Sequence, residues 1–251
     1  MGLVLVFDLD ETLIATTKTY KDGKYYIDDI KLNEKLFQII FHAKSLNPDG
    51  PVAVDAILLL TNNTNVPSEY RGLRMGFLDI IDLVVKQKYG EGFDEIFDKI
   101  YTGKREEVNS GKRTTELVEF RGFGEPIYEA SNIKKEFPKG KRLVKDIETV
   151  AKILREKAHS TENLEDRIIF FDDEKIVHKI KGELEGHGGK YITIVPPFGK
   201  GEDKTDLSAV YDALRMGMPH QAKGGARRHR TARKKKQVRR TKKYRVKKTS
   251  S

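Results

Sequence analysis

Two aspartates near the start of the chain, Asp8 and Asp10, are the residues whose type and spacing most directly point to chemistry. They follow the apolar run at residues 3–7 and are separated by a single leucine. Two carboxylates held this close need a cation between them or a shared proton. Mg²⁺ prefers oxygen ligands and usually takes one or two protein carboxylates together with phosphate and water. The pair therefore predicts a Mg²⁺-dependent site for phosphoryl transfer, in which a carboxylate can serve as the nucleophile.

Two further polar clusters follow apolar runs in the same way. Thr61 follows the run at residues 53–60, and Asp172 and Asp173 follow the run at residues 168–171. Each run is short and rich in β-formers, which predicts a buried strand. The carboxyl ends of parallel strands meet at one edge of a sheet, so we expect these polar groups to converge on the first aspartate pair. The threonine would offer its hydroxyl to phosphoryl oxygens, and a lysine would balance the negative charge.

The alternative for an Asp-x-Asp pair after a strand is a solvated turn with no catalytic role. The order of the three clusters argues against that alternative. One strand is followed by Asp-x-Asp-x-Thr, the next by Thr and a later one by Asp-Asp. We therefore favour the catalytic interpretation.

The elements that must position these residues can be predicted from local patterns. The Asp-Gly pair at residues 22–23 lies between aromatic and β-branched arms, which predicts a β-hairpin over residues 16–27. Asn33 is a suitable N-cap for an amphipathic helix that continues to residue 43. Further along, the sequence predicts a helix over residues 68–88, a strand at 99–101 closed by Thr102 and Gly103, a helix over 143–154, a strand over 191–195 and a helix over 206–216.

Strands that alternate with helices predict an α/β fold, with a central parallel sheet between two layers of helices. We expect one domain over residues 1–219, with an insertion of loops and small elements at 104–138. Residues 220–251 contain 15 Lys and Arg and no acidic residue. This tail has too few apolar residues to offset its ordering entropy and is expected to be disordered.

Composition narrows the class of protein. The chain of 251 residues has no cysteine, which excludes a disulfide framework and a thiolate metal site. No apolar run approaches the roughly 20 residues that span a bilayer, so no membrane partner is expected. These features favour an intracellular protein, cytoplasmic or nuclear. Outside the tail, 33 basic residues face 38 acidic ones, so the body carries about −5 and the tail +15.

Taken together, these motifs resemble those of the haloacid dehalogenase (HAD) superfamily of phosphatases. The resemblance covers residues 1–215: the first motif matches at residues 8–12 (DLDET), the second at Thr61 and the fourth at residues 172–173 (DD). It implies a Rossmann-like fold and hydrolysis of a phosphomonoester through an aspartyl-phosphate. Asp8 would be the nucleophile and Asp10 the general acid/base. The implied cofactor is Mg²⁺, bound by Asp8, the backbone carbonyl of Asp10 and Asp172, with Asp173 beside them.

The third-motif lysine is less sharply defined. Lys145, followed by Asp146, resembles the Lys-Asp pair of the carboxy-terminal-domain phosphatases that act on RNA polymerase II. Lys139 and Lys141 lie close by and are alternatives, although we favour Lys145. The resemblance further predicts substrate-binding roles for Thr12 and Asn62, which the list of site residues includes.

The same carboxy-terminal-domain phosphatases resemble the chain at FDLDETL (7–13), whereas FFDDE (170–174) is more similar to the magnesium-dependent phosphatases. Both subgroups lack a large lid, and the hairpin around residues 22–23 would be their small flap. An open site admits a phosphorylated protein or a nucleic-acid end, whereas a closed one favours a metabolite. The segment at 104–138 is a second candidate cover for the site.

Three functions are compatible with these features. We favour a phosphatase that acts on a phosphoprotein. The first alternative is a phosphatase for nucleic-acid ends or nucleotides, tethered by the tail; the second is a non-catalytic binding protein with the same fold. Residues 223–248 could bind nucleic acid or another polyanion, or act as a nuclear localisation signal. Such a tail on a small enzyme also resembles those of large DNA virus proteins.

Overall fold

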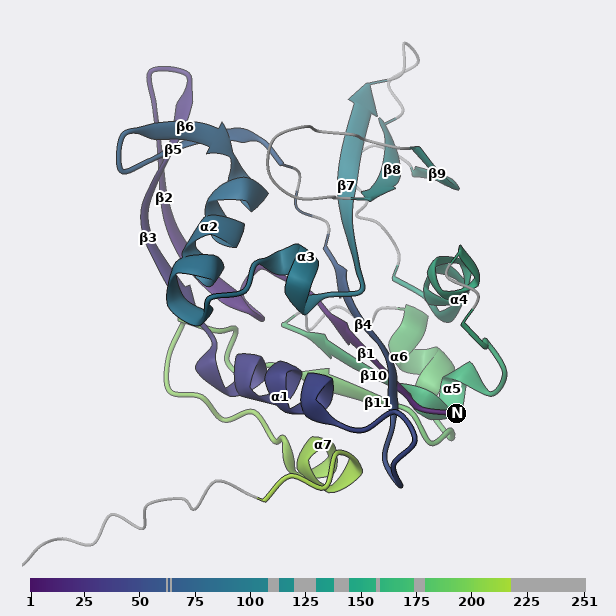
Figure 1. Ribbon diagram of the computed structural model, residues 1–251. Coiled ribbons are helices and arrows are strands. Elements are labelled where there is room, and N and C mark those ends of the chain that lie inside the picture. Colours follow the sequence, from purple (N-terminus) through teal and green to yellow (C-terminus); the bar gives the residue numbers. More distant parts are fainter. Residues whose placement is uncertain are drawn as a thin grey trace, which may run out of the picture. The chain divides into compact units, whose positions relative to one another are not determined.

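The apolar runs form the middle of a seven-stranded sheet in the computed structural model (Figure 1). Its order is β11-β10-β1-β4-β7-β8-β9. The first five strands are parallel: β11 (Lys190–Thr193), β10 (Ile168–Asp172), β1 (Leu3–Phe7), β4 (Val54–Leu60) and β7 (Lys99–Glu107). The last two, β8 (Arg113–Glu119) and β9 (Ala130–Phe137), are antiparallel. The predicted α/β class with parallel strands is confirmed, but the sheet as a whole is mixed.

The structure describes residues 1–217, except 62, 64, 108–112, 120–129, 138–144, 157–158 and 174–178. For residues 102–107, 113–119 and 130–137 it describes the backbone alone. Residues 1–218 form one compact unit by their contacts. The predicted disorder of the tail at 220–251 falls outside the described residues. Within the described ranges, no helix combines the length and the apolarity that crossing a bilayer requires.

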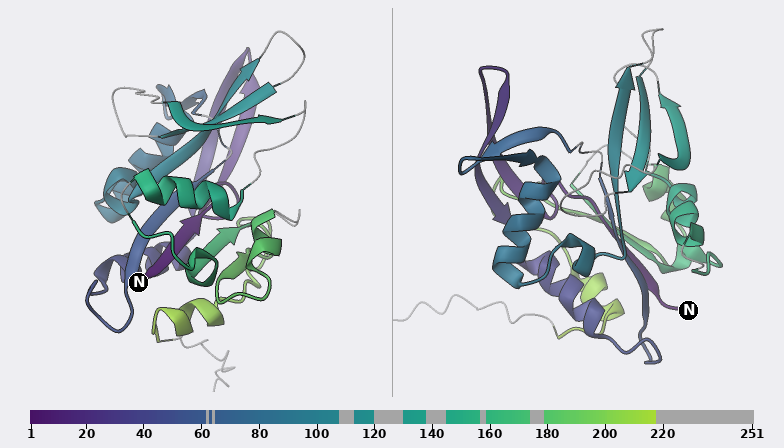
Figure 2. Two further views of the ribbon diagram at one scale, coloured as in Figure 1. Left: turned by 90° about the vertical axis from the view of Figure 1, so that its right-hand side faces the viewer. Right: turned by 45° about the horizontal axis from the view of Figure 1, so that its top comes forward.

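Helices cover both faces of the parallel strands, as Figures 1 and 2 show. Alternate residues of the central strands enter two separate cores, because successive side chains of a strand point to opposite faces. Phe7 and Leu59 belong to the core that packs against α1 (Glu34–Ser45), α2 (Phe77–Tyr89), α3 (Phe93–Ile96) and α7 (Ser208–Ala213). Val6 and Leu58 belong to the core that packs against α4 (Ile147–Glu156), α5 (Leu164–Arg167) and α6 (Lys179–Leu184). The expected three layers are therefore present.

The predicted hairpin is part of a second, four-stranded sheet of order β2-β3-β5-β6. Strands β2 (Ile14–Lys21) and β3 (Lys24–Leu32) form the hairpin, and its turn lies at Asp22 and Gly23 as expected. Strands β5 (Pro67–Tyr70) and β6 (Leu73–Gly76) pair beside it. The flap is thus larger than a single hairpin.

The prediction of one helix over residues 68–88 is wrong in its first third. Arg71 and Gly72 both adopt positive φ, 49° and 79°, and make the tight turn between β5 and β6. A helix cannot pass through two such residues, whereas a two-residue hairpin turn needs them. Helix α2 therefore begins only at Phe77.

The prediction for residues 99–138 is also wrong. Thr102 and Gly103 do not close a strand, because β7 continues through them to Glu107. The segment expected to hold loops and small elements, 104–138, contributes β8 and β9 to the main sheet. Pairing along the edge of β7 supplies backbone hydrogen bonds to these strands. Tertiary context of this kind overrides weak local propensity.

Several other elements match their predictions more closely. Strands β1, β4 and β10 and helix α1 are confirmed, and the Asn33 side chain accepts a hydrogen bond from the Leu36 amide at 3.4 Å, as an N-cap does. The last helix and the last strand are shorter than expected, and α4 begins at Ile147. Helices α3, α5 and α6 were not predicted.

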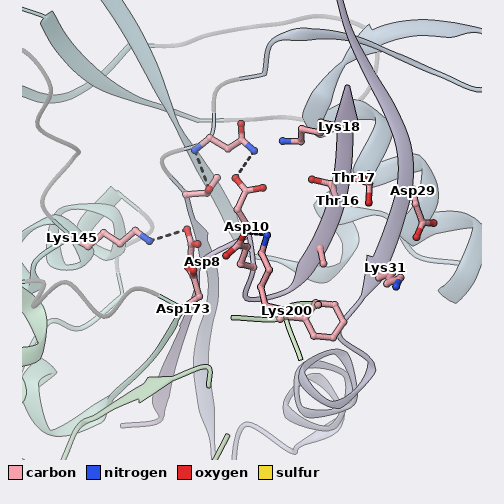
Figure 3. Close-up of a pocket in the computed structure, with 16 residues that line it drawn as sticks. Asp8, Asp10, Thr16, Thr17, Lys18, Asp29, Lys31, Lys145, Asp173 and Lys200 are labelled. Carbon is pink, nitrogen blue, oxygen red and sulfur yellow. Dashed lines mark hydrogen bonds and ion pairs between the residues drawn. The ribbon is translucent and has the colours of Figure 1, made fainter. Parts of the chain in front are cut away.

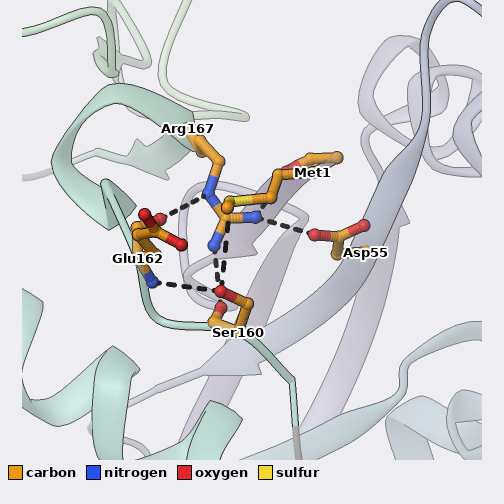
Figure 4. A network of polar contacts seen from close by, with 6 residues as sticks. Met1, Asp55, Ser160, Glu162 and Arg167 are labelled. Carbon is orange, nitrogen blue, oxygen red and sulfur yellow. Dashed lines mark hydrogen bonds and ion pairs between the residues drawn. The ribbon is translucent and has the colours of Figure 1, made fainter.

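Arg167, at the end of α5, joins the amino-terminal ends of the central strands (Figure 4). Its guanidinium donates to the carbonyls of Gly2 at 2.8 Å, Ser160 at 2.8 Å and Glu162 at 3.1 Å, and pairs with Asp55 at 2.7 Å. A buried arginine with these partners is fully satisfied, which a buried charge requires. The network holds one end of the sheet in register, and the candidate site lies at the other end.

Candidate functional site

The three predicted polar clusters meet at the carboxyl ends of β1, β4 and β10. Asp8 directly follows β1, and its amide donates to the carbonyl of Phe171 on β10 at 2.9 Å. Thr61 directly follows β4, and its amide donates to the carbonyl of Tyr101 on β7 at 3.0 Å. These backbone bonds continue the sheet past its apolar core, so the polar side chains project from adjacent strand ends.

A buried lysine lies between two of the aspartates. The ammonium of Lys145 is 2.8 Å from a carboxylate oxygen of Asp8 and 2.8 Å from one of Asp172. All three side chains are almost inaccessible to solvent. Burial alone would lower the pKa of Lys145, but the two carboxylates outweigh it and raise the pKa, so the amine stays charged. Of the three candidate lysines, Lys145 reaches the site, whereas Lys139 and Lys141 lie outside the described residues.

The carboxylates outnumber this single cation. Oxygens of Asp8, Asp172 and Asp173 all lie within 4.8 Å of one another. Burial, with Asp172 adding to it against the opposing effect of Lys145, raises the pKa of Asp8 to about 7. Burial and the neighbouring Asp172 raise the pKa of Asp173 to about 6. One ammonium cannot neutralise three carboxylates, so the cluster fits a divalent cation with oxygen ligands.

Asp10 lies apart from that cluster and has different partners. One of its carboxylate oxygens accepts a hydrogen bond from the Asn63 side chain at 2.7 Å, and the Asn63 amide donates to the Thr61 hydroxyl at 3.1 Å. Burial raises the pKa of Asp10, while Lys18 and the bond from Asn63 act in the opposite direction. A raised pKa favours a carboxyl group that can donate a proton and later accept one. The predicted role of the Asp10 backbone carbonyl as a metal ligand stays a prediction.

A sharp turn separates Asp10 from Thr12. Glu11 adopts a left-handed φ of 55°, its amide donates to the Ile14 carbonyl and its own carbonyl accepts from the Phe198 amide. The Glu11 side chain pairs with Lys200 at 3.0 Å. The loop at 198–200 is thereby attached to the first motif, although it is distant in sequence.

These residues surround a pocket of about 700 Å³, shown in Figure 3. Asp8, Asp10, Thr61 and Lys145 line it together, as does Asp173. The remaining lining residues come from the first-motif turn, the hairpin, the segment after β4 and the loop at 198–200: Glu11, Ala15, Thr16, Thr17, Lys18, Asp29, Lys31, Asn63, Phe198, Gly199 and Lys200.

Two predicted substrate-binding residues are not among those that line the pocket. Thr12 is fully buried, and its hydroxyl has no hydrogen-bond partner. Its carbonyl accepts from the Asn33 side chain at 2.9 Å, which attaches the first motif to the start of α1. Asn62 lies outside the described residues. The neighbouring Asn63 makes the contact with Asp10 instead, and nothing in the sequence distinguishes these two asparagines.

The hairpin wall of the pocket was not predicted to take part in the site. Lys18, on β2, places its ammonium 3.7 Å from the centroid of the Phe77 ring. Desolvation of that ammonium lowers the pKa of Lys18, and the nearby Asp10 partly offsets the effect. In the sequence this lysine is one of several in a polar hairpin, so only tertiary structure identifies it.

Comparison with known proteins does not assign the chain to a family. No family model matches it, and neither curated proteins nor solved structures give a significant match. Any function proposed for the chain therefore depends on the residues and the geometry of this pocket.

Proposed function

We propose that the protein is a Mg²⁺-dependent phosphatase of the HAD type, which hydrolyses a phosphomonoester through an aspartyl-phosphate on Asp8. The observation that carries the proposal is the contrast between two carboxylates that line one pocket. Asp8 contacts a buried lysine and two further carboxylates, whereas Asp10 contacts an asparagine and has a raised pKa. Titratable groups in contrasting environments can take separate nucleophile and acid/base roles.

In the first step, a carboxylate oxygen of Asp8 attacks phosphorus and the bond to the leaving-group oxygen breaks. Asp10, in its protonated form, gives its proton to that oxygen. Lys145 holds Asp8 in place through its 2.8 Å contact and offsets part of the negative charge. The Thr61 hydroxyl accepts from the Asn63 amide, which leaves its own proton available for a phosphoryl oxygen.

In the second step, Asp10 is a carboxylate and accepts a proton from water. That water attacks the phosphorus, the bond to Asp8 breaks and inorganic phosphate is released. Both aspartates return to their starting states. A divalent cation bound by Asp8, Asp172 and Asp173 would supply charge neutralisation for the phosphoryl oxygens.

A phosphoprotein is the substrate that we favour. Along its hairpin side, the pocket is bounded by strands β2 and β3 rather than by a separate domain. Such a wall leaves space for a substrate much larger than the phosphoryl group. The alternative, a nucleic-acid end or a nucleotide, is supported by the charge of the tail at 220–251. A non-catalytic binding protein is disfavoured because Asp8, Asp10, Thr61 and Lys145 are all present around one pocket.

The decisive variant is Asp8→Asn, which keeps the shape of the side chain but removes the nucleophilic carboxylate. We expect its kcat for an aryl phosphate with Mg²⁺ to fall at least about a thousandfold. The control is Asp49→Asn, an exposed aspartate outside the pocket, whose kcat should match that of the unmodified protein. Circular dichroism and thermal melting would verify that both variants fold. Undiminished turnover by Asp8→Asn would rule out the mechanism.

A further inference from the structure

The hairpin wall lies where the leaving group of the proposed reaction must be. This step rests on the proposed function, in which Asp10 gives its proton to the leaving-group oxygen. The leaving group is therefore next to Asp10, on the side away from Lys145 and Asp172. Figure 3 shows Thr16, Thr17 and Lys18 on that side of Asp10. Whatever the substrate carries beyond its phosphoryl group meets strand β2 first.

An irregularity in the hairpin directs Lys18 into the pocket. Thr17 pairs with Asp29, but the next residue, Lys18, pairs with Ile27, so Asp28 is an extra residue on β3. The Asp28 carboxylate accepts a hydrogen bond from the Thr19 hydroxyl at 2.7 Å. Bulges of this kind bend a strand and re-aim side chains near active sites. Consequently three consecutive residues, 16 to 18, line the pocket, whereas a regular strand would present alternate ones.

The wall also carries cations that are available to a ligand. Within the described part of the chain, neither Lys18 nor Lys31 forms a salt bridge, and both line the pocket. The Lys18 ammonium is held over the ring of Phe77, which fixes its position without neutralising it. Lys200 is already paired with Glu11, and Asp29 is the acidic residue of the wall. The hairpin wall therefore complements an anionic leaving group.

Strand β2 offers backbone groups as well as charge. It is an edge strand of its sheet, and past Ile14 it pairs only with β3 among the described strands. An open edge can accept an extended peptide as an additional strand, which a nucleic acid cannot imitate. The aromatic residue that lines the pocket is Phe198, which offers little for successive bases to stack on. These features favour a polypeptide as the occupant.

We propose that the open edge of β2, together with Lys18, is a docking site for an extended segment of a phosphoprotein that carries an acidic side chain next to its phosphorylated residue. The phosphoryl group enters between Asp8 and Asp10, and the backbone of the segment pairs along Thr16 to Lys18. The acidic side chain, an aspartate, a glutamate or a second phosphorylated residue, reaches the Lys18 ammonium. Lys31 provides additional positive charge farther along the wall.

The first test measures selectivity within each enzyme, so that a general change in activity cancels. Three phosphopeptides would differ only in the neighbour of the phosphorylated residue, which is Asp, Ala or Lys. For the unmodified protein we expect kcat/KM for the Asp peptide to exceed that for the Lys peptide about tenfold, as a partly desolvated ion pair would produce. Lys18→Met should bring this ratio close to one, and Lys18→Glu should invert it.

Lys21→Met is the matched control, because Lys21 lies on the same strand but not in the pocket. It should keep the ratio of the unmodified protein. An equal ratio in the unmodified protein, Lys18→Met and Lys18→Glu would overturn the proposal. Faster turnover of a phosphorylated oligonucleotide than of the Asp peptide, with the same dependence on Lys18, would also overturn it and assign the subsite to nucleic acid.

The second test measures binding without turnover, by fluorescence anisotropy of the labelled Asp peptide with Asp8→Asn. Methylation of the peptide's backbone nitrogens, one at a time, should weaken binding about tenfold at alternate positions and hardly at all between them. Equal tolerance of methylation at every position would exclude strand pairing. If peptides bind in this charge-selective way but no phosphoester is hydrolysed, the docking site stands and the proposed function fails. Hydrolysis of an aryl phosphate without any role of Lys18 in peptide selectivity gives the reverse result.

Discussion

Asp8 and Asp10 are separated by one residue, yet their surroundings differ in almost every respect. The Asp8 side chain is buried against Lys145 and two carboxylates, and the Asp10 side chain is held by Asn63. The turn at Glu11 follows directly, with a left-handed φ that the pairing to Ile14 and Phe198 stabilises. Contrasting surroundings at this spacing allow two similar acids to do different chemistry.

The raised pKa of Asp8 predicts how metal binding should depend on pH. A divalent cation needs the carboxylate, so it must displace the proton that Asp8 holds below about pH 7. We expect the affinity for Mg²⁺ to rise as the pH increases towards 7, by at most about tenfold per pH unit, and to level off above it. The additional proton held by Asp173 should steepen the dependence below about pH 6.

Isothermal titration calorimetry with Mg²⁺ at several pH values would measure this, and buffers of different ionisation enthalpy would count the released protons. Asp49→Asn should show the same profile as the unmodified protein. An affinity that stays constant between about pH 5 and pH 8 would contradict a carboxylate with a raised pKa as ligand.

At the level of elements, the pocket depends on a loop that packs against the hairpin. The segment at 198–200 lies against the start of β2, where a Cβ atom built on Gly199 would be 2.4 Å from the Cβ of Ala15. Gly199 also has a φ of 85°, which side chains rarely adopt. Two separate constraints therefore require glycine at this position, one steric and one conformational.

Gly199→Ala should accordingly lower the free energy of unfolding by about 2–4 kcal/mol, through strain and overpacking together. Gly23→Ala is the matched control, because Gly23 has a φ of 76° but no atom near the added Cβ. Its cost should be about 1 kcal/mol, from the backbone alone. Urea denaturation of both variants would measure the difference, and equal costs would show that Ala15 yields without penalty.

At the scale of the whole chain, charge is divided between two regions. Residues 1–219 carry about −5, and the 15 Lys and Arg after them are not balanced by any acid. The described pocket lies within residues 1–217, so its chemistry does not need the tail. The tail is therefore expected to affect where the protein binds rather than what it does to phosphorus.

Deletion of residues 219–251 tests this division. The shortened chain should hydrolyse an aryl phosphate with the kcat of the full chain, because the compact unit ends at Met218. The full chain should bind a labelled DNA duplex in an anisotropy assay, and the shortened chain should not. Binding by the full chain should weaken roughly a thousandfold between about 50 and 200 mM salt, as counterion release predicts for six or more phosphate contacts. Equal DNA binding by both chains would place the polyanion site elsewhere.

Much of the architecture could be predicted from local patterns. Strands β1, β4 and β10 are continuous apolar runs, the turn at Asp22 and Gly23 has a strong local signal, and Asn33 caps α1. Such features depend on neighbours in the chain, and for that reason they can be read from it. The parallel arrangement follows from their alternation with helices. From this arrangement alone, Asp8, Asp10 and Thr61 could be expected at one edge of the sheet.

Tertiary structure decided the rest, because the deciding contacts join residues far apart in sequence. Strands β5, β8 and β9 acquire their conformation by pairing with neighbours, which local propensity does not reveal. Lys145 became the partner of Asp8 through its 2.8 Å contact, and Asn63 rather than Asn62 was found to hold Asp10. Lys18 was one lysine among several until the register shift in the hairpin directed it into the pocket. The sequence by itself determined which acids could act on phosphorus; only the packing of the hairpin and the loop at 198–200 determined what lies beside the leaving group.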